Sequence, residues 1–311
     1  MGKLAIAVHG GAGPDSEYIK KNFQDYKKGL EEAVRAGYKI LEEGGSSLDA
    51  VEAAVNYLED NPLFNAGRGS ALNENAEVEM DASIMNGENL ECGAVSIVRH
   101  VKNPVTLARA VMEKTKHIYL GDMGATDFAH QINLEMRPDS YFVTEHSYEE
   151  YESAAKEEGR NPGEAAEVQL KRKGHGTVGA VALDKNGNIA AATSTGGIEN
   201  KKASRIGDSS IIGIGSYANN KTCAVSSTGD GEVLIQHITA FHISALMEYK
   251  GLSLKDACHH FIKEKCKDVE GDMGIIAVDT QGNVCLEYKA GRMHRAWMTS
   301  EDELKVSIYN D

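Results

Sequence analysis

A threonine stands where a polar stretch of the chain runs directly into an apolar one. Glu, Lys, Arg and Gly dominate residues 157–173, whereas residues 178–184 read as a buried strand. Thr177 follows Gly176 at this junction. Its hydroxyl could attack the Gly176 carbonyl, because glycine has no side chain to obstruct the strained backbone that such an attack needs. An N-to-O acyl shift, followed by hydrolysis of the ester, would leave a chain that begins at Thr177.

An N-terminal threonine carries both parts of a hydrolytic catalyst. Its hydroxyl is a nucleophile, and its α-amine, whose ordinary pKa is about 7.7–8.0, can act as a general base near neutral pH. The junction therefore predicts self-cleavage before Thr177 and acyl transfer on the same residue. The alternative is a strand that simply starts after a loop, since threonine is a common strand residue.

Further along the chain, charged residues and glycines could form either a ligand site or ordinary surface structure. Arg205 could hold a carboxylate bidentately and Asp208 an ammonium group, although the same two residues could form an ordinary surface ion pair. Gly229 and Gly231 suit a loop whose backbone approaches a ligand closely, and a simple turn would use them too.

Strands and helices occur in both halves of the chain. The expected strands are Leu4 to Val8, Val78 to Met85, Gly93 to Val98, Thr177 to Asp184, Ile189 to Thr195, Ile275 to Asp279 and Val284 to Tyr288. The expected helices are Phe23 to Glu43, one through Ala50 to Leu58, one from Asn103-Pro104, Val233 to Tyr249 and Leu254 to Lys265. Asn186-Gly187 and Gly282-Asn283 predict hairpin turns. This mixture indicates an α+β fold with helices layered on mainly antiparallel sheets.

Composition limits the classes of protein to which the chain can belong. The chain has 311 residues, of which 41% are apolar and 26% charged, as in a soluble globular enzyme. A net charge of −14 opposes binding to nucleic acid or to an anionic membrane. The apolar run Leu4 to Val8 is too short for a signal-peptide core, and no run approaches the ~20 apolar residues of a membrane span. The cysteine count is 5, with no CxxC pair, so we expect free thiols and a cytoplasmic location.

Several longer motifs follow one another in a characteristic order. They are His9 to Pro14, Asn65 to Gly69, Met80 to Ser83, His175 to Asp184, Ala192 to Gly197, Arg205 to Ser209 and Ser227 to Glu232. Together they cover nearly the whole chain, which resembles the plant-type asparaginases, also called isoaspartyl peptidases, of the N-terminal-nucleophile hydrolases. The resemblance implies a four-layer αββα sandwich. It also implies one domain, 1–311, cut into an α subunit, 1–176, and a β subunit, 177–311, with a linker at about 157–176.

The resemblance also assigns roles to residues. It implies that Thr177 is the nucleophile, that Thr195 contacts and orients it, and that Asn65 lies nearby. Thr228 and Gly229 would form the oxyanion hole. Arg205 and Asp208 would bind the substrate, with Gly229 and Gly231 against it. The implied reaction releases L-aspartate from L-asparagine or β-aspartyl dipeptides through a threonyl acyl-enzyme. We expect no other partner than this small substrate and a second αβ unit, giving a homodimer of αβ heterodimers.

No cofactor is implied by the resemblance, but a structural cation is. In bacterial members of the family a similar loop holds Na⁺ (or K⁺) through backbone carbonyls, the oxygen ligands that a hard cation prefers. The matching positions are Leu58, Glu59, Asn61, Phe64, Ala66 and Arg68. A plain structural loop is the alternative.

The chain departs from the family pattern at Asp230, at Ser204, which replaces a glycine, and in the segment Tyr288 to Ala296. Asp230 puts a carboxylate beside the oxyanion loop, and Lys289 and Arg292 stand in a segment that is small and Thr-rich in relatives. The two cations could bias which leaving group is accepted.

Other functions remain open from the sequence. A glycosylasparaginase would have Asp before the threonine, where this chain has Gly176, and related threonine endoproteases are longer. A chain that keeps the fold without processing would be a binding protein. Phosphate binding by the glycine turn after His9 is poorly supported, because no Gly-Lys-Ser/Thr follows.

Overall fold

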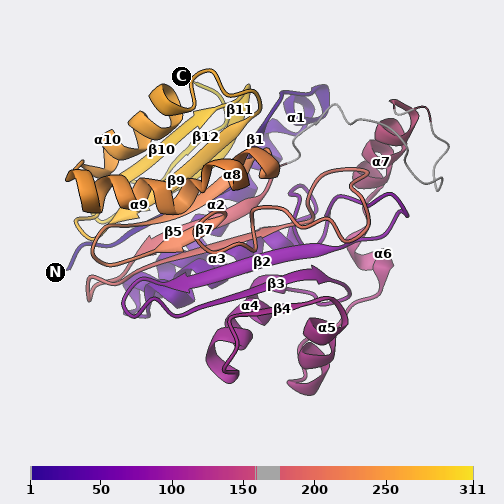
Figure 1. Cartoon of the computed structure of the whole chain (residues 1–311), viewed down its shortest axis with the longest axis horizontal. Helices are drawn as coiled ribbons and strands as arrows, with labels where there is room; N and C mark the ends of the chain where they lie inside the picture. The colour runs from indigo at the N-terminus through magenta and orange to yellow at the C-terminus, as the bar shows by residue number, and fades with distance from the viewer. Residues whose placement is uncertain (1, 158, 160–175, 311) are drawn as a thin grey trace.

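The computed structural model describes residues 2–157, 159 and 176–310. Of the linker expected over 157–176, only Glu157, Gly159 and Gly176 are among these residues. Helices and sheets together confirm the α+β class (Figure 1). Within the described ranges, no helix has the length and apolarity to cross a membrane.

The described strands form two sheets. The larger is 8-stranded, in the order β12-β11-β1-β5-β6-β2-β3-β4, and is antiparallel except between β3 and β4. Its strands are β1 Ala5–Gly13, β2 Met80–Asn86, β3 Cys92–Val98, β4 Tyr119–Gly121, β5 Val178–Leu183, β6 Ile189–Thr195, β11 Arg292–Thr299 and β12 Lys305–Ser307. The smaller, in the order β10-β9-β8-β7, consists of β7 Ser216–Ala218, β8 Cys223–Gly229, β9 Met273–Asp279 and β10 Val284–Lys289. The two expected hairpins are confirmed as β5–β6 and β9–β10.

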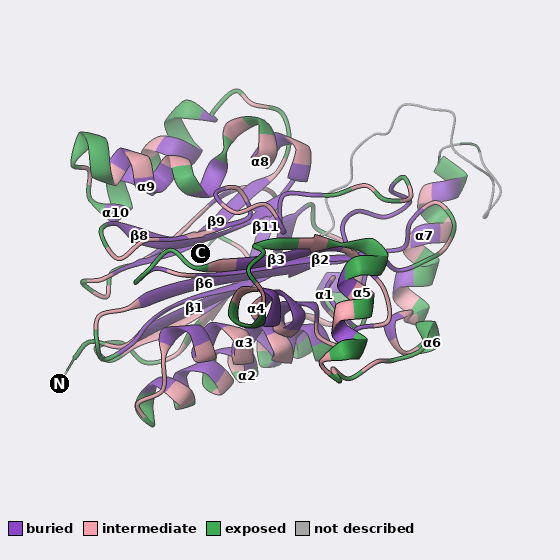
Figure 2. Ribbon diagram, turned by 60° about the horizontal axis from the view of Figure 1, so that its bottom comes forward, coloured by how far each residue is buried: buried purple, intermediate pink, exposed green. Residues whose placement is uncertain are grey.

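Helices cover the outer face of each sheet (Figure 2). Those packed against the larger sheet include α2 Phe23–Glu42, α3 Ser47–Asp60, α4 Pro104–Lys114 and α5 Asp122–Gln131. The smaller sheet is covered by α8 Gly231–His237, α9 Thr239–Lys250 and α10 Leu254–His259, which continues as a π-helical turn, His260–Lys265. Short helices α1 Glu17–Lys21 and α6 Asp139–Phe142, with α7 Glu145–Glu157, complete the described set.

Local sequence signals explain most helix ends. Ser46 and Asp49 form a capping box at the start of α3, and Pro104 is the first residue of α4. The single helix expected over 233–249 is wrong, because Ile238 takes a left-handed φ of 50° and separates α8 from α9. A β-branched residue rarely adopts that conformation, so no local pattern signals the break.

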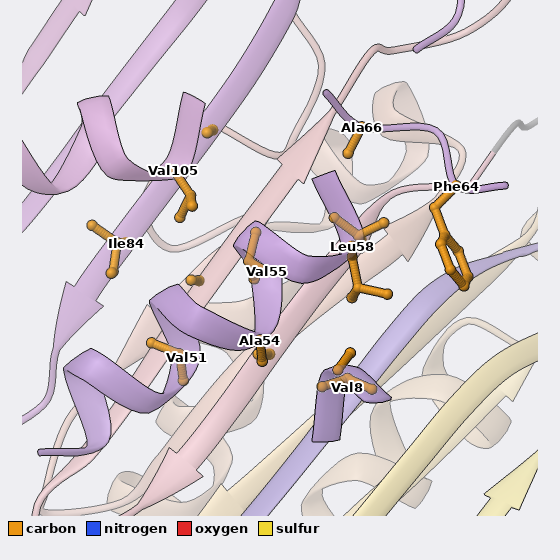
Figure 3. Packing of buried hydrophobic residues seen from close by; sticks show 14 of the residues in the cluster. Val8, Val51, Ala54, Val55, Leu58, Phe64, Ala66, Ile84 and Val105 are labelled. Carbon is orange, nitrogen blue, oxygen red and sulfur yellow. The ribbon is translucent and has the colours of Figure 1, made fainter. Parts of the chain in front are cut away.

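Apolar clusters lie between each pair of neighbouring layers. One packs the outer helices on the larger sheet, where α3 residues such as Val51, Val55 and Leu58 face β1 and its neighbours (Figure 3). A second lies between the sheets, and a third between the smaller sheet and its helices. Apolar packing thus holds helices against each sheet and the sheets against each other.

The layer between the sheets changes character along its length. On β5, Val181 and Leu183 belong to the apolar cluster between the sheets, and the alternation of a strand turns Thr177, beyond its start, to the same face. On β8, Ala224 belongs to that cluster, and Ser226 and Thr228 continue its face. The sheets are therefore joined by apolar contacts at one end and by buried polar residues at the other.

Candidate active site

Thr177 lies at the polar end of the layer between the sheets and is 4% exposed. Ser209 Oγ donates to the Thr177 hydroxyl at 3.4 Å, and the Thr177 amide donates to Thr228 Oγ1 at 3.2 Å. Both atoms that the predicted chemistry requires, the hydroxyl oxygen and the nitrogen, are thus held by hydroxyl groups of other segments.

Thr228 is positioned to donate as well as to accept. Its Oγ1 accepts hydrogen bonds from the amides of Thr177 and of Ala12, the latter at 3.2 Å. A hydroxyl that accepts two N–H bonds can direct its own hydrogen to a third group. Gly229, the next residue, has φ 133° and lies against the Asp272 carbonyl, so a side chain would not fit there. These properties suit an oxyanion hole.

Gly176 packs directly on the backbone of Gly11. A Cβ on either residue would collide with the other, and Gly11 has φ 109°. Both glycines are therefore required by close approach of two main chains. The peptide bond before Thr177 is held against the irregular part of β1 between His9 and Ala12.

His9 forms a hydrogen bond with the main-chain carbonyl of Thr177. Since a carbonyl only accepts, His9 Nδ1 donates to the Thr177 carbonyl at 2.8 Å, and Nε2 accepts from Ser226 Oγ at 2.8 Å. Ser226 Oγ in turn lies 2.7 Å from Thr193 Oγ1. Burial lowers the pKa of His9 to about 3, so the ring is neutral and the bond from Nδ1 fixes its tautomer. The motif match did not assign His9 a role, but its position, two residues after the inward-facing Ala7, could have indicated one.

Thr195 and Asn65 support the turn beside the nucleophile. Val178 pairs with Ser194, so continuing the same register by one residue places Thr177 opposite Thr195. The Thr195 hydroxyl accepts from the Gly197 amide at 3.0 Å, and Asn65 Nδ2 donates to the Gly197 carbonyl at 2.6 Å. Both residues therefore order the chain that follows β6.

Arg205 is paired with a carboxylate that the sequence did not indicate as its partner. Its Nε and Nη2 donate to Glu232 Oε1 and Oε2 at 3.1 and 2.8 Å. Such a two-point pair fixes the plane of the guanidinium. Gly231 lies so close to this group that a Cβ would be 2.8 Å from Arg205 Nη2 and 3.0 Å from Asp208 Oδ1. The structure thus brings Arg205, Asp208 and Gly231 together, as expected.

Asp208 is the least satisfied charged group of the site. It is buried, and its Oδ2 has no hydrogen-bond partner among the described residues. Burial raises the pKa of Asp208 to about 7, although the charge of Arg205 acts in the opposite direction. A buried carboxylate oxygen without a partner is costly, and an ammonium group would satisfy it.

The loop matched to a cation site is closed by its own hydrogen bonds. Main-chain amides donate to the carbonyls of the candidate set, with Arg68 bonded to Glu59 at 2.7 Å and Phe64 bonded to Asn61 at 3.2 Å. Carbonyl oxygens keep a second lone pair, so these residues can still coordinate a cation. No cluster of His, Cys, Asp or Glu suited to a metal occurs in the described ranges.

Asp230 has a structural contact beside the oxyanion loop. Its Oδ2 accepts from the Asp272 amide at 3.3 Å, and its own amide donates to the Asp272 carbonyl at 2.8 Å. These bonds tie the start of α8 to the start of β9, which carries Met273 opposite Gly229.

Comparison with known proteins gives consistent matches. The family model described as asparaginase matches residues 2–308. An isoaspartyl peptidase of Escherichia coli (strain K12) is 45% identical, over 100% of this chain and 98% of that protein. Proteins called isoaspartyl peptidase/L-asparaginase are each 43% identical in Xenopus laevis, over 99% of this chain and 96% of that one, and in Homo sapiens, over 97% and 94%.

We expect His9→Leu to slow chain cleavage before Thr177 by about 10–100-fold, the effect of removing one buried donor worth about 1–3 kcal/mol. His9→Asn should recover part of the rate, because an amide Nδ2 can occupy the position of Nδ1 and donate to the Thr177 carbonyl. The measurement is the time course of the two fragments on denaturing gels. Equal rates for the Leu and Asn variants would remove His9 from this role.

Asp208→Asn should stabilise the protein at high pH. Because the pKa of Asp208 in the folded chain is about 7, above its value of 3.8 when unfolded, the folded state holds the proton longer and loses stability as pH rises through this range. The Asn variant lacks this loss, so we expect it to be more stable by roughly 2–4 kcal/mol at pH 8 and by little at pH 4. Urea unfolding at both pH values tests this, and a difference independent of pH would contradict it.

Proposed function

The chain belongs to the asparaginase family, and from that membership we propose that it is an amidohydrolase that cuts itself before Thr177 and then releases L-aspartate from L-asparagine and β-aspartyl dipeptides. The observation that carries the proposal is the placement of Thr177, whose hydroxyl and nitrogen are both held by buried hydroxyls of other strands and loops. The names of its relatives, isoaspartyl peptidase and L-asparaginase, give the substrate class.

In the first step Thr177 Oγ attacks the carbonyl carbon of Gly176. The C–N bond breaks, the hydroxyl proton passes to the nitrogen of Thr177, and an ester joins Gly176 to Oγ. Water then opens the ester and leaves a free α-amine on Thr177. Support comes from the contact of Gly176 with Gly11, which holds the scissile bond against β1, and from His9, which donates to the Thr177 carbonyl.

Substrate binding follows from the two charged groups. The α-ammonium of an aspartyl substrate would bind Asp208, whose Oδ2 has no partner among the described residues. The α-carboxylate would bind Arg205, whose plane is fixed by Glu232. A substrate without free α groups would leave both charges unsatisfied, which explains selection for the aspartyl residue.

Acyl transfer uses the new amine as the base. It takes the hydroxyl proton as Oγ attacks the β-carbonyl, and the developing oxyanion is stabilised by the Thr228 hydroxyl and the Gly229 amide. The proton then passes to the leaving nitrogen as the C–N bond breaks. Water, activated by the same amine, hydrolyses the β-aspartyl ester on Thr177.

We assign the fold to the αββα sandwich of the N-terminal-nucleophile hydrolases, as one domain that yields an α subunit, 1–176, and a β subunit, 177–311. The strand order supports this division. β1 of the first fragment pairs with both β11 and β5 of the second, and β2 pairs with β6. Because these ladders interleave, the fragments would stay in one sheet after cleavage.

We further propose a homodimer of such αβ units and a cytoplasmic location. All 5 cysteines are free thiols, four of them buried, which suits a reducing compartment.

A structural Na⁺ (or K⁺) on the carbonyls of the loop from Leu58 to Arg68 is also proposed, with no cofactor required for catalysis. Replacing sodium and potassium salts by tetramethylammonium chloride at equal ionic strength should lower Tm by about 2–5 °C, because a bound ion stabilises only the folded state. Salt exchange is the appropriate test, since main-chain ligands cannot be mutated away. An unchanged Tm in all three salts would exclude this ion.

Thr177→Ala should give a single uncut chain without hydrolase activity. Thr177→Ser should still cut and turn over, more slowly, because it keeps both the hydroxyl and the future amine. Intact-mass measurement reports the cut site, and ammonia release from L-asparagine and aspartate release from a β-aspartyl dipeptide report activity. Normal processing or normal turnover in the Ala variant would overturn the proposal. A wild-type chain that never cuts and hydrolyses neither substrate would instead be a binding protein.

A further inference from the structure

A small cavity lies beside the bond that is cut. Its volume is about 60 Å³, several times what one water molecule needs. Its lining includes Gly10, Gly176, Glu150, Glu199, Arg292 and His294. The cavity therefore joins the scissile glycine to β11, the strand where this chain departs from its family.

The leaving group must lie where it can receive a proton. In the proposed reaction that proton comes from the α-amine of Thr177. Before cleavage the same nitrogen is bonded to Gly176. The part of a substrate that leaves must therefore lie next to the place of Gly176, and the cavity there is the space that it would enter.

Arg292 lines this cavity as a buried charge without a carboxylate partner. It is 8% exposed, its Nε has no hydrogen-bond partner, and no acidic group forms an ion pair with it in the described part of the chain. Its Nη1 donates to His294 Nδ1 at 3.1 Å. Burial lowers its pKa, and a guanidinium nevertheless stays charged near neutral pH. A buried charge that lacks a counterion is costly unless a ligand supplies one.

The acidic residues of the cavity do not supply that counterion. Burial raises the pKa of Glu199 well above its ordinary value, and its Oε2 accepts a hydrogen bond from the Leu72 amide at 3.1 Å instead of pairing with Arg292. Glu150 lies 3.5 Å from His146 Nε2, on its own helix α7. Among the described residues that line the cavity, Arg292 is the one Lys or Arg side chain that an entering anion would meet.

We propose that Arg292 binds the α-carboxylate of the amino acid that leaves from a β-aspartyl dipeptide. This inference rests on the proposed function and adds a second recognition site to it. When the C–N bond breaks, the leaving nitrogen takes its proton from Thr177, and the carboxylate stays on Arg292 until release. Asparagine, whose leaving group is ammonia, has no group for this site, so the site favours dipeptides.

Lys289 lies in the same segment but has other contacts. Its Nζ donates to the main-chain carbonyls of Cys266, at 3.2 Å, and Val269. It does not line the cavity beside Gly176. Of the two cations that could influence the leaving group, the structure assigns the role to Arg292 and provides Lys289 as a matched control.

The test compares three substrates on fully processed enzyme: L-asparagine, β-aspartyl-alanine and β-aspartyl-alaninamide, whose carboxylate is blocked. In the wild type, kcat/KM for β-aspartyl-alanine should exceed that for the amide by about 10–100-fold, the effect of one charge-assisted pair. Arg292→Gln should remove this preference and leave kcat/KM for asparagine within about threefold of the wild type, because the leaving group of asparagine has no carboxylate for this residue to bind. Arg292→Lys should retain part of it, and Lys289→Gln all of it.

The wild-type comparison needs no variant, so the proposal can be refuted even if Arg292→Gln fails to fold or process. Equal kcat/KM for the acid and the amide in the wild type would overturn it. So would a parallel loss on all three substrates in a processed Arg292→Gln enzyme, which would make the residue structural. Failure of the wild type to hydrolyse any of the three would refute the proposed function instead.

Discussion

Buried polar groups between two sheets must bond to one another, and this requirement shapes the whole site. Where Val181 and Leu183 face the second sheet, apolar contact is sufficient. Where His9, Thr193 and Ser226 replace apolar residues on these strands, each donor and acceptor needs a partner. An unsatisfied buried polar group lowers the free energy of unfolding by about 1–3 kcal/mol. The chain from Thr193 through Ser226 and His9 to the Thr177 carbonyl meets this need. The nucleophile is thus held by the same bonds that join the sheets.

The strand order makes this arrangement compatible with a cut chain. β1 carries both His9 and Gly11, and it is paired on both sides with strands that follow Thr177. Its register with β5 places His9 opposite Gly179, so the histidine ring can reach back to Thr177. Cleavage before Thr177 removes no ladder bond, since β5 begins at Val178. The catalytic geometry can therefore survive loss of the covalent link that first built it.

Local patterns were enough to predict much of the fold, and longer motifs to predict much of the site. Strand-like runs around Asn186-Gly187 and Gly282-Asn283 predicted the hairpins, and Asn103-Pro104 predicted a helix start. The sequence also indicated Thr177, Arg205 and Asp208, because each is a chemically suitable residue in a distinctive motif. Contacts between distant segments were not predictable. The pairing of Arg205 with Glu232, the bond from His9 to Thr177 and the contact of Gly11 with Gly176 all depend on register across more than one strand.

Two buried charged side chains of opposite sign, Asp208 and Arg292, each have one polar atom without a hydrogen-bond partner among the described residues. Asp208 has an oxygen without a partner, and Arg292 has a nitrogen without one. A folded chain normally pairs such groups or excludes them, because each costs stability. A β-aspartyl dipeptide carries an ammonium on the aspartyl residue and a carboxylate on the residue that leaves, with the scissile amide between them. These two groups destabilise the free protein and, for the same reason, select its ligand. Only a ligand that carries an ammonium and a carboxylate on opposite sides of an amide can pair with both groups.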